Sequence, residues 1–317
     1  MNATALSLIV LTLNVSGPRR VHHDWTTRRD AIIKGLQAQR PDIAAFQEIW
    51  HPEDTKALAA AAGHAYRAES PALGVVVTSR FPIDSWSEQD LGAHAAVLRA
   101  TVHSAQGPFD VYSARLSPGP MKMRRLGQMF RLAEFVRTES SSRPFLLLGD
   151  LAEGTDERES SLLLDLLEAR DLCVSHGDEI CGRTLADQRV DYALIPYSAY
   201  EPQERARTTF TELPNGDDDG ETSPSHFGLR TALDRGFFKL RPAATPVGRA
   251  EALGSIADSI EIARLDAIAR SRSGGWIPFL GTWESVSAQT DVSTLALLAE
   301  EVHSAQIRAA GRVPSNE

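Results

Sequence analysis

The sequence is poor in cysteine and has no long apolar run. Among its 317 residues there are two cysteines, Cys173 and Cys181, eight positions apart. They could close one small loop or remain free thiols, and a zinc site built from cysteines would need a second pair. No segment approaches 18 consecutive apolar residues, so we expect no membrane-spanning helix.

Basic residues are also in the minority. Lys and Arg total 33 against 42 Asp and Glu, which gives a formal net charge of −9. Such a chain repels polyphosphates unless a local basic patch compensates, so its charge disfavours nucleic acid as a partner. Hydrophobic residues make up 42% and charged residues 24%, the usage of a globular protein with a sizeable core.

The first 15 residues lack the features of a signal peptide. No basic stretch precedes the apolar segment Leu6 to Val15, and no small-residue cleavage site follows it. We therefore interpret this segment as a buried strand and take a cytoplasmic location as the default expectation.

Strands and helices alternate without a strict βαβ rhythm. Short apolar runs bounded by turn residues predict strands, and apolar positions at helical spacing predict helices. The expected strands cover residues 6–15, 43–47, 73–79, 97–102, 109–114, 145–149, 190–195 and 227–233, and the expected helices cover 26–39, 52–62, 123–137 and 161–169. This layout favours a mixed sheet, or a sandwich of two sheets with helices outside.

The character of the chain changes beyond Pro242. Residues 250–272 and 291–310 are rich in alanine and leucine, which predicts a helical appendage over 243–317 beside a main domain over 1–242. Just before this point, the acidic segment 213–225 matches no calcium-binding loop and is expected to be solvated charge.

Polar residues stand at the ends of several expected strands, where a scaffold can hold reactive groups firmly. Taken singly, each has an ordinary structural explanation as a turn former, a surface carboxylate or a satisfied histidine. They are Asn14, Glu48, Asp150, Asp191 and His226.

The order of these residues and their flanking motifs is more specific than any one of them. Asn14, AFQEIW with Glu48, LLLGDL with Asp150, RVDYALI with Asp191 and SHFGL with His226 follow one another along residues 6 to 240. In this the chain resembles the endonuclease, exonuclease and phosphatase superfamily. The segments DVYSARLSPGP and CGRT add a resemblance to its neutral sphingomyelinase branch.

The resemblance implies a four-layer α/β sandwich of two mixed sheets with outer helices. It implies that Glu48, assisted by Asn14, binds Mg²⁺ or another divalent cation. It further implies that Asp150 orients the attacking water, and that His226, held by Asp191, acts as a base or contacts the phosphate.

Three positions depart from the pattern of the family. Arg115 stands where the family has a histidine, and it can clamp a phosphate but cannot donate a proton at neutral pH. Ala152 removes the asparagine amide of the motif GDxN, and Ser225 replaces the aspartate of SDH. The loss of one transition-state donor costs about 10² to 10³ in rate.

Two functional hypotheses follow. The first is a metal-dependent phosphodiesterase, sphingomyelinase-like, acting on a small or lipid-derived phosphodiester. The retained Glu48, Asp191 and His226 support it. The second is a degenerate member of the family that binds a ligand or partner, or performs other chemistry in the same cleft. The departures at Arg115, Ala152 and Ser225 support this second hypothesis.

Overall fold

The computed structural model describes residues 8–18, 25–118, 122–140 and 143–151, followed by shorter stretches. These stretches are residues 163–164, 166–175, 178–179, 184–185, 189–196, 199, 206–209, 228–233 and 237–238. The expected appendage over 243–317 and the acidic segment 213–225 lie outside the described residues.

The first sheet has six strands in the order β13-β14-β1-β2-β4-β3. Strands β1 and β2 are parallel, and the remaining neighbours are antiparallel. The strands are β1 (Leu8–Asn14), β2 (Ile43–Gln47), β3 (Tyr66–Ser70), β4 (Val75–Ser79), β13 (Arg207–Thr209) and β14 (Gly228–Leu233).

The second sheet also has six strands, in the order β5-β6-β7-β8-β12-β9. Its one parallel pair is β7 with β8. The strands are β5 (Ile83–Gly92), β6 (Ala95–Ser104), β7 (Gly107–Arg115), β8 (Phe145–Asp150), β9 (Ala169–Asp171) and β12 (Asp191–Pro196). A separate two-stranded ribbon pairs β10 (Val174–Ser175) with β11 (Asp178–Glu179).

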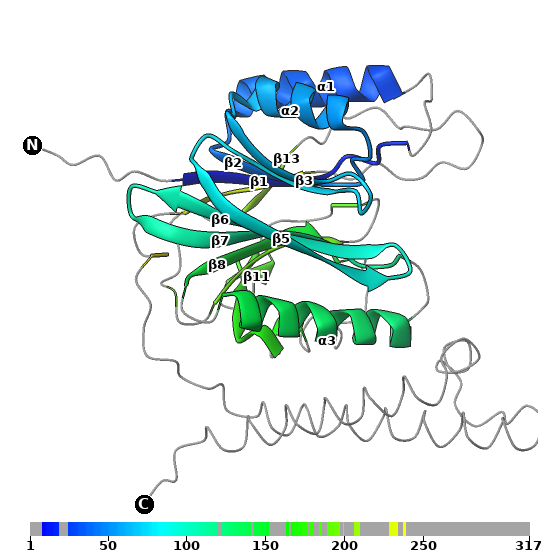
Figure 1. The fold of residues 1–317 in the computed structure, drawn as a ribbon, viewed down its shortest axis with the longest axis vertical. Helices are drawn as coiled ribbons and strands as arrows, with labels where there is room; N and C mark the ends of the chain where they lie inside the picture. The colour runs from blue at the N-terminus through cyan, green and yellow to red at the C-terminus, as the bar shows by residue number, and fades with distance from the viewer. Residues whose placement is uncertain are drawn as a thin grey trace, which may run out of the picture.

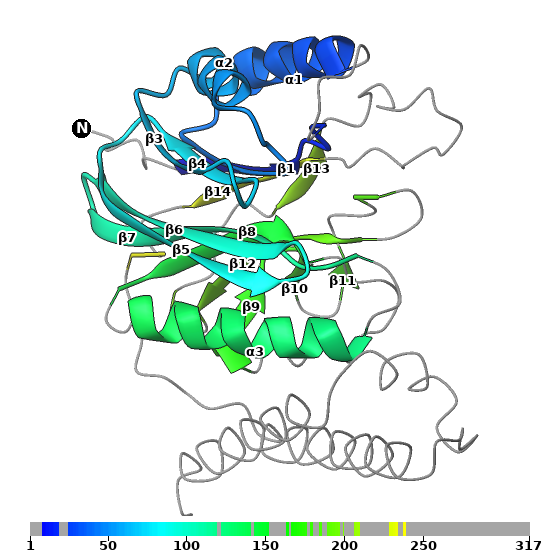
Figure 2. The same ribbon diagram turned by 45° about the vertical axis from the view of Figure 1, so that its right-hand side comes forward.

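The two sheets pack face to face between layers of helix (Figures 1 and 2). Helices α1 (Trp25–Gln39) and α2 (Pro52–Ala62) cover the first sheet, and α3 (Lys122–Glu139) covers the second. Separate apolar clusters fill the space between the sheets and the space under each helical layer. The expected four-layer α/β sandwich is therefore confirmed.

Six described strands were missing from the sequence-based prediction: β3, β5, β9, β10, β11 and β13. Strand β5 lies at the edge of its sheet, and its residues Ile83–Gly92 are largely polar and exposed. Its Trp86 is 50% exposed. Because edge strands need not bury a whole face, they lack the apolar run on which the prediction relied. The helix expected over 161–169 also extends too far, since β9 begins at Ala169.

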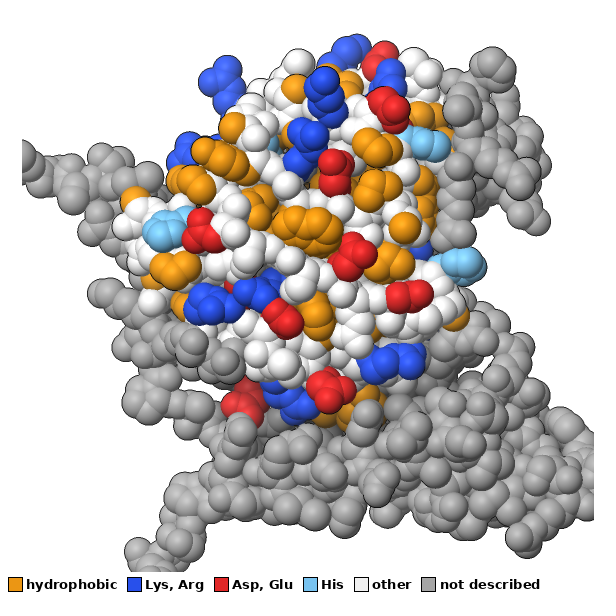
Figure 3. Space-filling view, in the orientation of Figure 1, with side chains coloured by type: hydrophobic (Ala, Val, Ile, Leu, Met, Phe, Trp, Pro, Cys, Tyr) orange, Lys and Arg blue, Asp and Glu red, His pale blue; other side chains and the backbone are white. Residues whose placement is uncertain are grey.

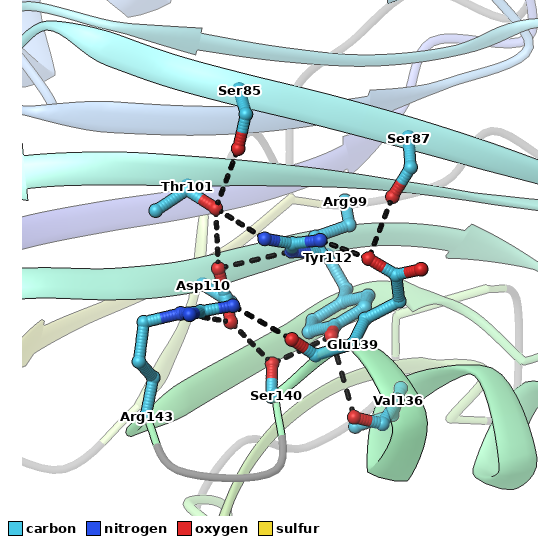
Figure 4. A network of polar contacts seen from close by, with 10 residues as sticks. All are labelled: Ser85, Ser87, Arg99, Thr101, Asp110, Tyr112, Val136, Glu139, Ser140 and Arg143. Atoms are coloured by element: carbon cyan, nitrogen blue, oxygen red, sulfur yellow. Dashed lines mark hydrogen bonds and ion pairs between the residues drawn. The ribbon is translucent and has the colours of Figure 1, made fainter.

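A buried polar network fastens the end of α3 to the second sheet (Figure 4). Asp110 of β7 is fully buried and accepts hydrogen bonds from Arg99 Nε at 3.0 Å, Arg143 Nε at 2.9 Å, Thr101 Oγ1 at 2.7 Å and Ser140 Oγ at 2.6 Å. Two arginines thus compensate one carboxylate that has no contact with water.

Cys173 is buried and disulfide-bonded. The other cysteine of the chain, Cys181, lies outside the described residues. Of the two alternatives that the sequence leaves open, the structure supports a cysteine engaged in a bond over a free thiol at Cys173.

On the face shown in Figure 3, the described basic and acidic side chains are interspersed. Neither sign forms a continuous area over the described part of this face. A mixed surface of this kind offers no phosphate-tracking stripe. Within the described part of the chain, no helix is both long and apolar enough to cross a bilayer.

Candidate active site at one end of the sandwich

The space between the sheets changes from apolar to polar toward one end. In β1 the apolar side chains of Leu8 and Val10 face the inter-sheet core. Thr12 and Asn14 follow at the same spacing of two residues along the strand. Because side chains alternate along a strand, Asn14 faces the same space. It is fully buried.

Three residues of the second sheet stand side by side at this end. In the register of the sheet, Arg115 of β7 lies opposite Asp150 of β8, and Asp150 lies opposite Asp191 of β12. Side chains in register on neighbouring strands share one face of the sheet. Val111 and Leu148 in the inter-sheet core show that this is the inner face.

Asn14 joins the two sheets. Its Nδ2 donates a hydrogen bond of 2.8 Å to Oδ2 of Asp150, and its Oδ1 accepts one of 2.9 Å from the backbone N–H of Ser16. Both ends of the amide are therefore fixed. The side chain of Asp150 is held in place by a residue 136 positions away in the sequence.

A second polar bridge lies one step deeper between the sheets. Gln47 Nε2 donates to Ser113 Oγ at 3.1 Å and to Thr12 Oγ1 at 3.2 Å. Ser113 Oγ in turn donates to the backbone oxygen of Phe46 at 2.9 Å. These bonds fix the spacing of the sheets directly beneath Asn14 and Asp150.

Glu48 follows β2 in the left-handed backbone region, with φ +57°. The N–H of Gly17 donates to the Glu48 backbone oxygen at 3.0 Å, and a Cβ at Gly17 would lie 2.6 Å from that oxygen. Only glycine permits so close an approach. The segment after β1 and the segment after β2 therefore hold each other in place. The Glu48 side chain remains 29% exposed.

Arg115 is the direct partner of Glu48. Its Nη1 donates to Glu48 Oε1 at 2.9 Å, and its Nη2 donates to the backbone oxygen of His94. Its guanidinium carbon lies 5.1 Å from the centre of the Trp50 ring. This stack is a cation–π contact. Trp50 was not singled out from the sequence, although it directly follows the QEI of the motif that contains Glu48.

Asp191 is positioned through its backbone. Thr184 Oγ1 accepts hydrogen bonds from the N–H groups of Val190 and Asp191, at 2.9 and 3.0 Å. Both Thr184 and Asp191 are fully buried. The motifs CGRT and RVDY, noted together in the sequence, are thus in contact, and Thr184 is a positioning residue that the sequence analysis did not name.

The structure brings four of the expected site residues together in two pairs, Asn14 with Asp150 and Glu48 with Arg115. It also places Asp191 beside Asp150. Asn14 is hydrogen-bonded to Asp150 and to the backbone of Ser16, not to Glu48. His226, Ala152 and Ser225 lie outside the described residues, and β14 begins two residues after His226.

Glu48 offers one carboxylate oxygen that could hold a hard cation. One oxygen of this carboxylate, Oε1, is engaged by Arg115, and among the described residues Oε2 has no hydrogen bond. A partly exposed carboxylate oxygen is the ligand type that Mg²⁺ prefers. Within the described part of the chain, no group of three His, Cys, Asp or Glu side chains converges on one point.

The sequence model of the Endonuclease/Exonuclease/phosphatase family matches residues 11–228. A putative neutral sphingomyelinase of Drosophila melanogaster is 27% identical over 199 residues. The match covers 54% of this chain and 45% of that protein, so the chain spans about half the length of this relative.

Among solved structures, sphingomyelinase C from Streptomyces griseocarneus superposes with a TM-score of 0.56 at 16% identity, covering 72% of this chain and 100% of that one. The catalytic domain of human Nocturnin gives 0.56 at 18% identity, covering 71% and 92%. At such identities the likeness concerns the fold.

Proposed function

Because the chain belongs to the Endonuclease/Exonuclease/phosphatase family, we propose that it is a metal-dependent phosphoric ester hydrolase. The substrate we propose is a small or lipid-derived phosphodiester, as for a sphingomyelinase-like phosphodiesterase. The observation that carries the proposal is the 2.8 Å bond between Asn14 and Asp150, flanked in register by Arg115 and Asp191. It gathers amide, carboxylate and cation at one end of the sandwich.

Asp150 orients the attacking water in this proposal. A carboxylate can accept a hydrogen bond from water and direct its lone pair at phosphorus. The Asn14 amide fixes Oδ2 of Asp150, so the carboxylate does not rotate away. In phosphoryl transfer, positioning and electrostatics supply most of the catalysis, which makes such fixation valuable.

In this proposal, two positively charged groups neutralise the charge on the phosphate: Arg115 and a divalent cation. Arg115 is the phosphate contact, since a guanidinium presents a planar fork of donors that matches phosphate oxygens. Glu48, through Oε2, and Asn14, through its amide oxygen, would hold Mg²⁺ or another divalent cation. When bound, such an ion neutralises phosphate oxygens and the leaving group.

Asp191 and His226 form the remaining pair of the proposal. Thr184 accepts a hydrogen bond of 3.0 Å from the backbone N–H of Asp191 and so fixes the backbone that carries this carboxylate. A carboxylate fixed in this way can set the tautomer and position of an imidazole. His226 then acts as a base or contacts the phosphate.

The ion pair of Arg115 with Glu48 favours a second candidate function. It occupies one oxygen of the proposed metal ligand with a permanent cation. A degenerate member of the family that binds a phosphate-bearing ligand or a partner without hydrolysing it, or that performs other chemistry in the same cleft, would tolerate this arrangement.

The two candidates are separated by assaying a panel of phosphodiesters, including sphingomyelin and a chromogenic diester, over a range of Mg²⁺, Mn²⁺ and Ca²⁺ concentrations. If the protein is a hydrolase, turnover should depend on the metal and should fall at least about 10²-fold in Glu48→Gln. This variant removes a charge at nearly constant volume. Binding of a diester without turnover at any metal concentration supports the second candidate. Hydrolysis that survives Glu48→Gln unchanged rejects the metal role of Glu48.

A further inference from the structure

Arg115 is fixed by three partners on two separate segments. It is bound to Glu48 after β2 and to the His94 backbone oxygen between β5 and β6, and it stacks on Trp50. Its side chain is 7% exposed. An arginine held on its planar face and at both terminal nitrogens has little freedom left to lose, so the ion pair is preorganised.

The stacking partner is itself confined. Gly74 lies against the Trp50 ring so closely that a Cβ at this position would be 2.5 Å from a ring carbon. Gly74 also has φ +69°, a conformation that favours glycine. Trp50 therefore cannot shift toward β4, and it keeps Arg115 over Glu48.

A fixed guanidinium beside Glu48 changes what that carboxylate can bind. Oε1 is 2.9 Å from Arg115 Nη1, so a divalent ion on Oε2 would lie within a few ångströms of a full positive charge. Charges this close interact strongly where solvent is largely excluded, and salt screens them weakly. The guanidinium and the metal ion thus oppose each other at one carboxylate.

We propose that Arg115 is a resident cation that competes with the divalent metal ion for Glu48. The inference rests on the proposed function, because that function assigns Glu48 to the metal. The Arg115–Glu48 ion pair then sets the metal affinity of this chain, and it makes that affinity weaker than Glu48 would otherwise provide.

The test is calorimetric titration of Mg²⁺, and of Mn²⁺ as a second probe, into the full chain and its variants. Arg115→Gln removes the charge and should bind Mg²⁺ at least about tenfold more tightly than the unmodified protein. Arg115→Lys keeps the charge and should bind as weakly as the unmodified protein. The double variant Arg115→Gln with Glu48→Gln should lose the whole gain.

An affinity of Arg115→Gln that is unchanged, weaker or undetectable overturns the inference, as does a gain that Arg115→Lys shares or that survives Glu48→Gln. If Arg115→Gln does not fold, Arg115→His measured at pH 8, where imidazole is ordinarily neutral, provides the same comparison. The readout is binding. A protein that hydrolyses no diester can still show the tenfold gain in Mg²⁺ affinity. Failure of the proposed function is therefore distinguishable from failure of this inference.

Discussion

Asn14 at the end of β1 and Asp150 at the end of β8 are joined by a hydrogen bond of 2.8 Å across the two sheets. Neither residue lies near the other in sequence, and both are buried. The bond therefore reports the packing of the two sheets directly at the place where the proposed chemistry occurs.

Asn14→Ala should lower kcat/KM for phosphodiesters by about 10², because it frees the carboxylate that positions water. It should also cost about 1 to 3 kcal/mol of unfolding free energy, since Asp150 loses a buried donor. Ser113→Ala is the matched control: it removes the neighbouring bridge to Gln47 without touching Asp150. Equal losses of activity in both variants would show that Asn14 acts only through stability.

Asp110→Asn should destabilise the protein by about 3 to 5 kcal/mol in urea unfolding, because it leaves Arg99 and Arg143 without their buried counter-charge. Asp84→Asn, which removes the exposed partner of His103, should cost less than about 1 kcal/mol. A comparable cost for the two variants would contradict the structural role given to the Asp110 network in Figure 4.

Gly149 precedes Asp150, and a Cβ there would lie 2.0 Å from the backbone oxygen of Ala114. Gly149→Ala must therefore separate β7 from β8, and it should cost about 1 to 3 kcal/mol while also displacing Asp150. Gly63→Ala is the control, because Gly63 has φ +75° but open space around it, so the added methyl group causes backbone strain without a steric clash. That control should cost about 1 kcal/mol and leave activity unchanged. Thermal unfolding together with a diester assay measures both effects.

Burial lowers the pKa of His64, whose ring nitrogens contact Thr78 Oγ1 at 2.7 Å and the Pro41 oxygen at 2.8 Å. The unfolded state then binds more protons than the folded state below about pH 6.5. The contribution of His64 to stability is complete above that pH, and it is lost as the pH falls toward the lowered folded value.

Unfolding free energy measured against pH should therefore decrease on acidification below about 6.5, by at most about 1.4 kcal/mol per pH unit from this group. His64→Gln should be less stable at pH 8 and should lack this part of the slope. An identical pH profile in the variant would mean that His64 titrates alike in both states.

Much of the architecture was predictable, because buried central strands such as Leu8–Asn14 and Phe145–Asp150 are continuous apolar runs. The ordered motifs placed Asn14, Asp150 and Asp191 at one end of the sandwich. The pairing inside the site was not predictable. That Asn14 would bind Asp150, and that Glu48 would bind Arg115, depends on how the two sheets face each other, and no local pattern encodes that.

The support around the site was equally hidden from the sequence. Trp50 contacts Arg115, and Thr184 binds the backbone of Asp191, yet neither residue type by itself marks a functional site. The signal that could have found them is proximity to a motif, since Trp50 comes two residues after Glu48 and Thr184 ends CGRT.

Rebuilding the family pattern separates the two candidate functions. In a weakened hydrolase, Ala152→Asn with Ser225→Asp should restore an oxygen-directed donor and a carboxylate, and turnover of simple phosphodiesters should rise by one or more orders of magnitude. If the protein is instead a degenerate member of the family, the double variant should still show no detectable hydrolysis. It should also weaken binding of the ligand or partner that the unmodified protein binds. Strong hydrolysis by the unmodified protein that falls in the double variant would contradict both, because Ala152 and Ser225 would then be adapted parts of a working phosphodiesterase. The measurement is initial rate under saturating Mg²⁺, with Glu48→Gln in the same background as the control for metal-dependent turnover.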